Sequence, residues 1–115
     1  MTAQDDLITL EPQDWDEMRR LAHRMVDDAM TYIETLRDRP VWRPVPHEVA
    51  EHFKQAAPRE PAGAPATYEE FLETIMPYQL GNTHPRFWGW YMGAGTVGGA
   101  LADFLASMLD PNQGG

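Results

Sequence analysis

Four residues near the end of the sequence have types and a spacing suited to holding a small ligand, namely His84, Trp90, Tyr91 and Gly93. They belong to one run, residues 84–95, in which aromatic residues stand beside glycines. Aromatic rings give a ligand apolar surface, and glycine lets it approach the backbone closely because no Cβ is in the way. The run therefore predicts one wall of a substrate pocket. Burial of the rings in an ordinary core, the common fate of aromatic residues, is the alternative.

The histidine of this run, His84, stands directly before Pro85 and has two interpretations. It can contact a substrate, or it can be structural and held by a hydrogen bond through one ring nitrogen, which is the commoner role of a lone histidine beside aromatic residues. We keep His84 as a candidate substrate-binding residue. No residue of the chain is assigned a catalytic role.

Two further motifs are weaker. Residues 93–98 have the G-x-G-x-x-G spacing of a dinucleotide-binding turn, but that turn works only between two parallel strands, and the sequence before it is helical in pattern. His47 and His52 resemble the zinc motif H-E-x-x-H with one residue too many, which turns the two rings apart by roughly 140° on a helix. We therefore predict neither a nucleotide site nor a metal site.

The order of signals from His84 onward resembles the pyridoxal phosphate (PLP)-dependent group II decarboxylases, the aromatic-L-amino-acid decarboxylase family. Members carry a His-Pro and aromatic segment, a bend that contains glycine, and a helix of the ALADFL type, which here is residues 100–105. The resemblance implies a carboxy-lyase that acts on an L-amino acid, with PLP taking up the electrons left when CO2 departs. It also implies a mainly α fold, the extended helical N-terminal arm of a fold-type I enzyme whose complete fold is α/β, and not a self-contained globule.

The same resemblance supplies roles for the candidate site. Trp90 and Tyr91 match aromatic positions of the substrate pocket, which face the cofactor. Gly93 stands where aromatic-amino-acid members have a threonine that contacts the substrate, and Met92 stands where they have a proline. These two departures leave the identity of the amino acid open.

The family holds PLP on a lysine, and the sequence has a single one, Lys54. It lies in a short amphipathic segment with no phosphate-binding pattern, so we predict a solvated side chain. No cofactor-binding residue is assigned, and we expect these residues to be the inactive N-terminal portion of the enzyme.

Composition limits the partners. The net charge is −9, with 18 acidic and 9 basic residues, which disfavours nucleic acid and anionic membranes. Cysteine is absent, and no apolar run approaches the ~20 residues that span a bilayer. A soluble, cytoplasmic protein is the expectation.

The first half of the sequence predicts helices separated by a strap. Apolar residues at spacings of three and four predict a helix over 12–37, which packs on its own domain or on the same helix of a second subunit. Three prolines make residues 39–46 extended, and Trp42 is expected to anchor them. A short helix over 46–57 and a loop over 58–66 follow. By resemblance, residues 1–66 form an arm that wraps the partner of a homodimer in a swapped arrangement.

The second half predicts the start of the decarboxylase domain, residues 67–115. Thr67 and Glu70 form a capping box that begins a helix, and Pro77 ends it. The chain is irregular to residue 95, and residues 96–109 form a helix so apolar on all sides that it must be buried. The alternative to a decarboxylase is a non-catalytic helical dimerisation module.

Overall fold

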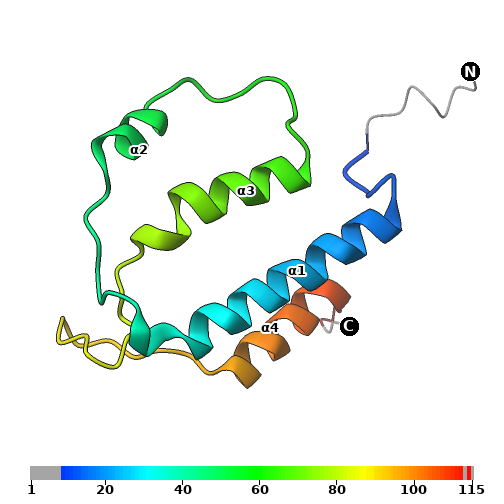
Figure 1. The fold of residues 1–115 in the computed structure, drawn as a ribbon. Coiled ribbons are helices and arrows are strands. Elements are labelled where there is room, and N and C mark those ends of the chain that lie inside the picture. Colours follow the sequence, from blue (N-terminus) through cyan, green and yellow to red (C-terminus); the bar gives the residue numbers. More distant parts are fainter. Residues whose placement is uncertain (1–8, 113, 115) are drawn as a thin grey trace, which may run out of the picture. The chain divides into compact units, whose positions relative to one another are not determined.

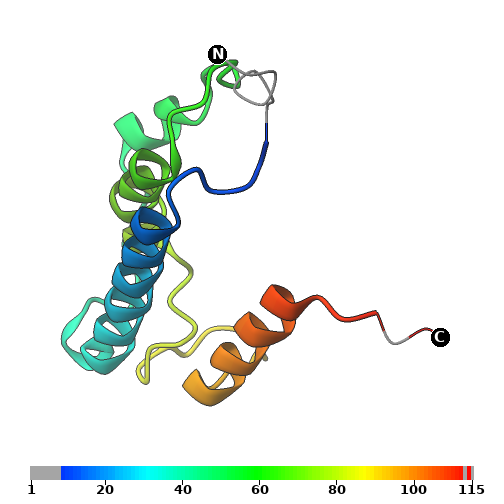
Figure 2. The same cartoon turned by 90° about the vertical axis from the view of Figure 1, so that its right-hand side faces the viewer.

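The computed structural model describes residues 9–112 and 114, which form helices joined by irregular segments, with no strand among them (Figures 1 and 2). The elements are α1 (Trp15–Glu34), the 3-10 turn η1 (Leu36–Asp38), α2 (His47–His52), α3 (Ala64–Thr74), the 3-10 turn η2 (Met76–Tyr78) and α4 (Val97–Leu109). The predicted mainly α fold is confirmed. The part of the predicted arm that falls on residues 1–8 lies outside the described residues.

The chain forms two compact units, Met1–Ile33 and Glu34–Gly115. Helix α1 makes up most of the described part of the first unit, and the second holds the remaining elements. The expected boundary between residues 66 and 67, between an arm and the start of a decarboxylase domain, stays a prediction. Hydrogen bonds cross that position, from His52 to Glu70 and from His84 to the carbonyl of Arg39, so residues 34–66 are tied to the segment that follows. The assignment of residues 67–115 to a decarboxylase domain stays a prediction.

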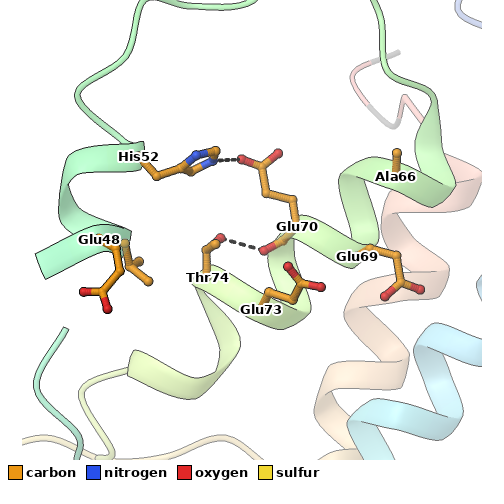
Figure 3. A pocket seen from close by; sticks show the side chains of 8 residues that line it. Glu48, His52, Ala66, Glu69, Glu70, Glu73 and Thr74 are labelled. Carbon is orange, nitrogen blue, oxygen red and sulfur yellow. Dashed lines mark hydrogen bonds and ion pairs between the residues drawn. The ribbon is translucent and has the colours of Figure 1, made fainter. Parts of the chain in front are cut away.

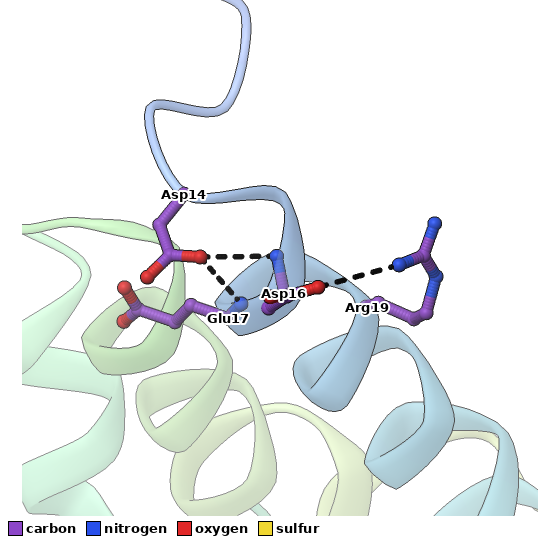
Figure 4. Close-up of polar contacts among 4 residues, drawn as sticks. All are labelled: Asp14, Asp16, Glu17 and Arg19. Carbon is purple, nitrogen blue, oxygen red and sulfur yellow. Dashed lines mark hydrogen bonds and ion pairs between the residues drawn. The ribbon is translucent and has the colours of Figure 1, made fainter.

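Helix α1 begins where Asp14 caps it (Figure 4). The Asp14 Oδ1 accepts hydrogen bonds from the backbone N–H groups of Asp16, at 3.0 Å, and Glu17, at 3.1 Å, so two of the unpaired donors of the first turn are satisfied. The helix therefore begins later than the predicted start at residue 12, because the capping carboxylate stands two residues after that position. The helix also ends earlier than residue 37, since the chain tightens into η1.

Helix α3 begins at Ala64, three residues before the expected start. Pro65 occupies the first turn, where its missing N–H costs nothing, and Gly63 precedes the helix with a φ of +88°. Thr67 is therefore inside the helix and donates to the Gly63 carbonyl at 2.9 Å. The predicted capping box of Thr67 and Glu70 is wrong.

The ends of α2 and α3 also differ from expectation. Helix α2 covers His47–His52 instead of residues 46–57, since the residues after it form irregular turns. Helix α3 ends at Thr74, and Pro77 lies in the separate turn η2 instead of ending the helix directly. The strap between η1 and α2 is extended at both ends, at Arg39 and Pro46, as its prolines predict.

Helix α4 agrees with the predicted range almost residue for residue. The Thr96 Oγ1 accepts the backbone N–H of Gly99 at 3.0 Å, and Asp110 ends the helix in the left-handed conformation with a φ of +40°. None of its residues is buried, and Phe104 and Met108 are 48% and 69% exposed. The expected burial of this helix is therefore not provided by the described chain and stays a prediction about the complete protein.

The apolar core is very small. Leu36 and Tyr68 are the buried hydrophobic residues of the described chain, and no described side chain is completely buried. A self-contained domain of this length would bury well over half of its unfolded surface, about 60–70%. The expectation that the chain is not a self-contained globule is confirmed. No helix in residues 9–112 combines the length and apolarity needed to cross a bilayer.

Candidate functional site

The loop that carries the candidate residues starts at a very close contact with the strap. Gly81 has a φ of +85°, a conformation that side chains rarely adopt. A Cβ at this position would lie 1.9 Å from the carbonyl oxygen of Val41, so the strap backbone occupies the space where a side chain would be. Gly81 is thus required twice, by its conformation and by the neighbouring backbone.

His84 is buried, at 4% exposure, and all its polar groups are hydrogen bonded. Its ring Nε2 lies 3.0 Å from the carbonyl oxygen of Arg39, and its Nδ1 lies 3.0 Å from the backbone nitrogen of Arg86. Its own backbone N–H donates to Gly81 at 2.9 Å, and its carbonyl accepts from Phe87 at 3.0 Å. We call the contact of Arg39 and Val41 with Gly81 and His84 the clasp.

Residues 82–93 form an aromatic loop on this base, in the yellow part of the ribbon in Figure 1. Trp88 and Trp90 are 94% and 77% exposed, and Tyr91 is fully exposed. The loop is also tied at its far end, where the Asn82 Nδ2 lies 3.5 Å from the carbonyl oxygen of Gly93, a long hydrogen bond. The rings are therefore presented to the outside by a loop with both ends held.

Glycine has a defined role within this loop at one position. A Cβ on Gly89 would lie 2.2 Å from the ring of Phe87, so the bare backbone lets that half-buried ring fold back over it. Gly93 and Gly95 are different, because a Cβ on either would meet no atom within 4 Å. At those two positions the backbone lies open.

The structure separates the four predicted site residues into two groups. Trp90, Tyr91 and Gly93 lie on the exposed aromatic loop, whereas His84 lies buried at its base. The geometry of His84 matches the structural alternative, since both ring nitrogens already have backbone partners. Contact of the four with a substrate stays a prediction.

Sequence reasoning missed the strap side of the clasp. Trp42 was the expected anchor, but it is 58% exposed, and the strap is held instead through the backbone carbonyls of Arg39 and Val41. Every residue carries a backbone carbonyl, so the residue type does not reveal which carbonyls make such contacts. Gly81 is the one residue of the clasp whose type gives a signal for it. It is a single glycine with no turn-forming residue directly before it.

The described residues do not fit PLP. Lys54, the only lysine, follows α2 with its side chain 69% exposed and its Nζ 2.8 Å from the Glu51 Oε1, so the predicted solvated side chain is confirmed. A lysine that holds a cofactor needs an enclosed site and a cradle for the phosphate. Lys54 has neither.

The groove between α2 and α3 is also unsuited to PLP (Figure 3). It has a volume of about 650 Å³ and opens widely to solvent, and its lining includes Glu48, Glu69, Glu70 and Glu73. These carboxylates would repel a phosphate group. The His52 Nε2 pairs with the Glu70 Oε1 across the groove. In residues 9–112 no three His, Asp or Glu side chains gather as a metal site.

Sequence comparisons show what the chain is similar to. It is 28% identical to Tryptophan decarboxylase 2 of Oryza sativa subsp. japonica over 105 residues, 88% of this chain and 20% of the relative. It is 30% identical to Phenylacetaldehyde synthase of Arabidopsis thaliana over 104 residues, 87% of this chain and 21% of the relative. For Tyrosine decarboxylase 2 of Narcissus pseudonarcissus the identity is 27% over 103 residues, 86% of this chain and 20% of the relative.

The resemblance to the aromatic-L-amino-acid decarboxylase family is confirmed. The chain spans about a fifth of the length of these relatives. No family model matches the chain, and no solved structure matches it. The similarity therefore connects the chain to amino-acid decarboxylases through sequence alone.

Proposed function

We propose that this chain is the N-terminal portion of a PLP-dependent amino-acid decarboxylase, in which it supplies subunit contacts and one wall of the substrate pocket. The observation that carries the proposal is the aromatic loop, which presents Trp90 and Tyr91 at 77% and full exposure from a buried base. Aromatic rings on a loop held at both ends suit contact with a group outside the chain. Relatives named as tryptophan and tyrosine decarboxylases support the reaction type.

The proposed substrate is an L-amino acid. Trp90 and Tyr91 would line its side chain with apolar surface, and the open backbone at Gly93 would leave room beside them. His84 would hold the loop from its base, because its ring nitrogens are already engaged. The net charge of −9 opposes a nucleic-acid partner, and the proposed location is the cytoplasm.

The proposal places the cofactor on residues of the complete enzyme other than those of this chain. PLP supplies the electron sink for decarboxylation when it is bound. The exposed Lys54 and the acidic groove between α2 and α3 do not provide a site for it. The contribution of this chain is therefore shape and apolar surface.

Exposed apolar faces support the proposed homodimer. In α1 no residue is buried, and Trp15, Met25 and Ile33 are 59%, 44% and 43% exposed. In α4 Leu105 and Leu109 are 57% and 76% exposed. Burial of apolar surface contributes about 25 cal/mol per Å², so faces of this kind favour association with another subunit.

A chimera tests the proposal. This chain replaces the matching segment of Tryptophan decarboxylase 2 from Oryza sativa, and CO2 release is measured with a panel of L-amino acids. We expect a PLP-containing dimer that decarboxylates at least one of them, whereas the 115-residue chain with PLP alone releases no CO2. The matched control replaces the segment by the same residues in scrambled order. A soluble, PLP-containing chimera without decarboxylase activity would contradict the proposal.

A non-catalytic helical dimerisation module is the second candidate, favoured by the apolar residues of α1. These residues recur at spacings of three and four, as in helices that pair with one another. This candidate expects the isolated chain to be a dimer by light scattering and to unfold cooperatively. The decarboxylase proposal expects the isolated chain to aggregate, because its apolar faces have no partner.

A further inference from the structure

We propose that His84 is a positioning residue that fixes the aromatic loop against the proline strap, so that the strap, residues 39–46, sets the place of the pocket wall. This inference rests on the proposed function for its effect on the pocket. The clasp itself stands on the geometry alone.

The hydrogen bonds of His84 determine which ring nitrogen carries the proton. A backbone N–H can only donate, so Nδ1, 3.0 Å from the nitrogen of Arg86, accepts and is unprotonated. A carbonyl oxygen can only accept, so Nε2, 3.0 Å from the oxygen of Arg39, donates. In this arrangement Nε2 carries the proton that is donated to Arg39. Nδ1 stabilises the local turn through the N–H of Arg86, and Nε2 bonds to the strap through the carbonyl of Arg39.

The second contact, between Gly81 and Val41, holds the same strap two residues further along. A Cβ on Gly81 would overlap the Val41 carbonyl oxygen at 1.9 Å, so the two backbones touch without intervening side chains. The Nε2 bond lies close by, within a site that buries His84 to 4% exposure. Burial of the His84 ring limits the access of water to its side of this bond, which strengthens it.

The aromatic loop has few other supports. Trp88, Trp90 and Tyr91 are exposed and so pack on little of the described chain. The bond from Asn82 to Gly93 is long, at 3.5 Å, and closes the loop on itself without tying it to the strap. The position of Trp90 therefore depends on the position of His84, which in turn depends on the strap.

Two substitutions at His84 separate its two bonds. In His84→Asn the side-chain oxygen stands where Nδ1 was and can still accept from Arg86, but nothing reaches Arg39. In His84→Gln the amide nitrogen stands near the place of Nε2 and can still donate to Arg39. Gly81→Ala disrupts the second contact of the clasp, because the added Cβ collides with the backbone of Val41. His23→Asn, on the exposed surface of α1, and Gly98→Ala, whose Cβ meets no atom within 4 Å, are the matched controls.

The functional measurement is made on the chimeric decarboxylase. We expect His84→Asn and Gly81→Ala to raise KM for the amino acid on the order of 10-fold with little change in kcat, since a displaced wall weakens binding. His84→Gln should restore KM to within about threefold of the parent. A structural role without positioning would reduce the amount of folded enzyme and leave KM unchanged, and that result would overturn the inference. Equal KM values for the Asn and Gln variants would overturn it as well.

A second measurement needs no activity. Thermolysin cleavage of the strap, between residues 41 and 42, is followed by mass spectrometry in the chimeric decarboxylase. We expect faster cleavage in His84→Asn and Gly81→Ala than in His84→Gln and the two controls, because only the first pair releases the strap. If the parental chimera is inactive but this order holds, the proposed function fails and the clasp stands. If the chimera is active and all variants are cut alike, the clasp fails and the function stands.

Discussion

The imidazole Nε2 of His84 lies 3.0 Å from the carbonyl oxygen of Arg39, a residue 45 positions earlier in the chain. This bond joins the proline strap to the base of the aromatic loop. Arg39 belongs to the expected arm, residues 1–66, and His84 to the expected start of the decarboxylase domain, residues 67–115. The strap and the base of the proposed pocket wall therefore share one part-buried hydrogen bond.

Gly81→Ala should destabilise the chimeric decarboxylase by about 1–3 kcal/mol, because alanine is strained at positive φ and its Cβ meets the Val41 carbonyl. Thermal unfolding monitored by circular dichroism measures the change. Gly98→Ala is the control, and its added Cβ should be neutral or stabilising by up to about 1 kcal/mol, since alanine favours helix. Equal unfolding temperatures for the two variants would contradict the Gly81 contact.

Asp14→Ala should weaken the start of α1 by about 1 kcal/mol, because the backbone N–H groups of Asp16 and Glu17 lose their acceptor. Hydrogen exchange of these two amides should accelerate. Asp14→Asn keeps a side-chain oxygen at the cap and should retain most of the protection. Asp27→Ala, an exposed acidic residue in the middle of the helix, should leave both amides unchanged. Unaltered exchange in Asp14→Ala would show that the cap contributes nothing.

Trp90→Ala should raise KM for the amino acid in the chimeric decarboxylase by roughly 10-fold or more, since it removes a large ring from the proposed wall. Steady-state CO2 release measures the effect. Trp88→Ala removes a more exposed ring of the same type from the same loop and should change KM less. If the two variants behave alike, the assignment of Trp90 to the pocket is wrong.

Lys54→Met should leave decarboxylation by the chimera unchanged and cost less than about 1 kcal/mol of stability, because it removes one exposed ion pair with Glu51. Borohydride reduction of the chain mixed with PLP, followed by intact-mass measurement, should show no more adduct on the parent than on unfolded chain. A specific adduct at Lys54 together with lost activity in Lys54→Met would place the cofactor on this chain after all.

Local signals in the sequence predicted the elements well where one signal acted alone. Thr96 and the apolar run after it defined α4 nearly to the residue, and the prolines defined the strap. Where two signals competed, the sequence misled. Thr67 and Glu70 form a plausible capping box, but Gly63 and Pro65 start the helix earlier and leave Thr67 inside it.

The candidate site was predictable in part. Aromatic residues beside glycines indicated a pocket wall or a core at residues 84–95, and a lone histidine next to them suggested either a ligand contact or a structural bond. The clasp itself was not predictable, because the strap takes part through backbone carbonyls, and any residue carries those. The Arg39 carbonyl accepts from His84, and the Val41 carbonyl lies against Gly81. Contacts over 45 residues also leave no periodic pattern in the sequence.

That long separation has a consequence for the order of folding. Joining two points 45 residues apart costs about 3 kcal/mol of loop-closure entropy, whereas the turns of α1 and α3 form between near neighbours. Helical turns can therefore appear early in a newly made chain, and the closing of the strap onto Gly81 is a late event. Until the strap closes onto Gly81, the aromatic rings of residues 82–93 have no fixed position. In the nascent polypeptide they must therefore be kept from associating with one another.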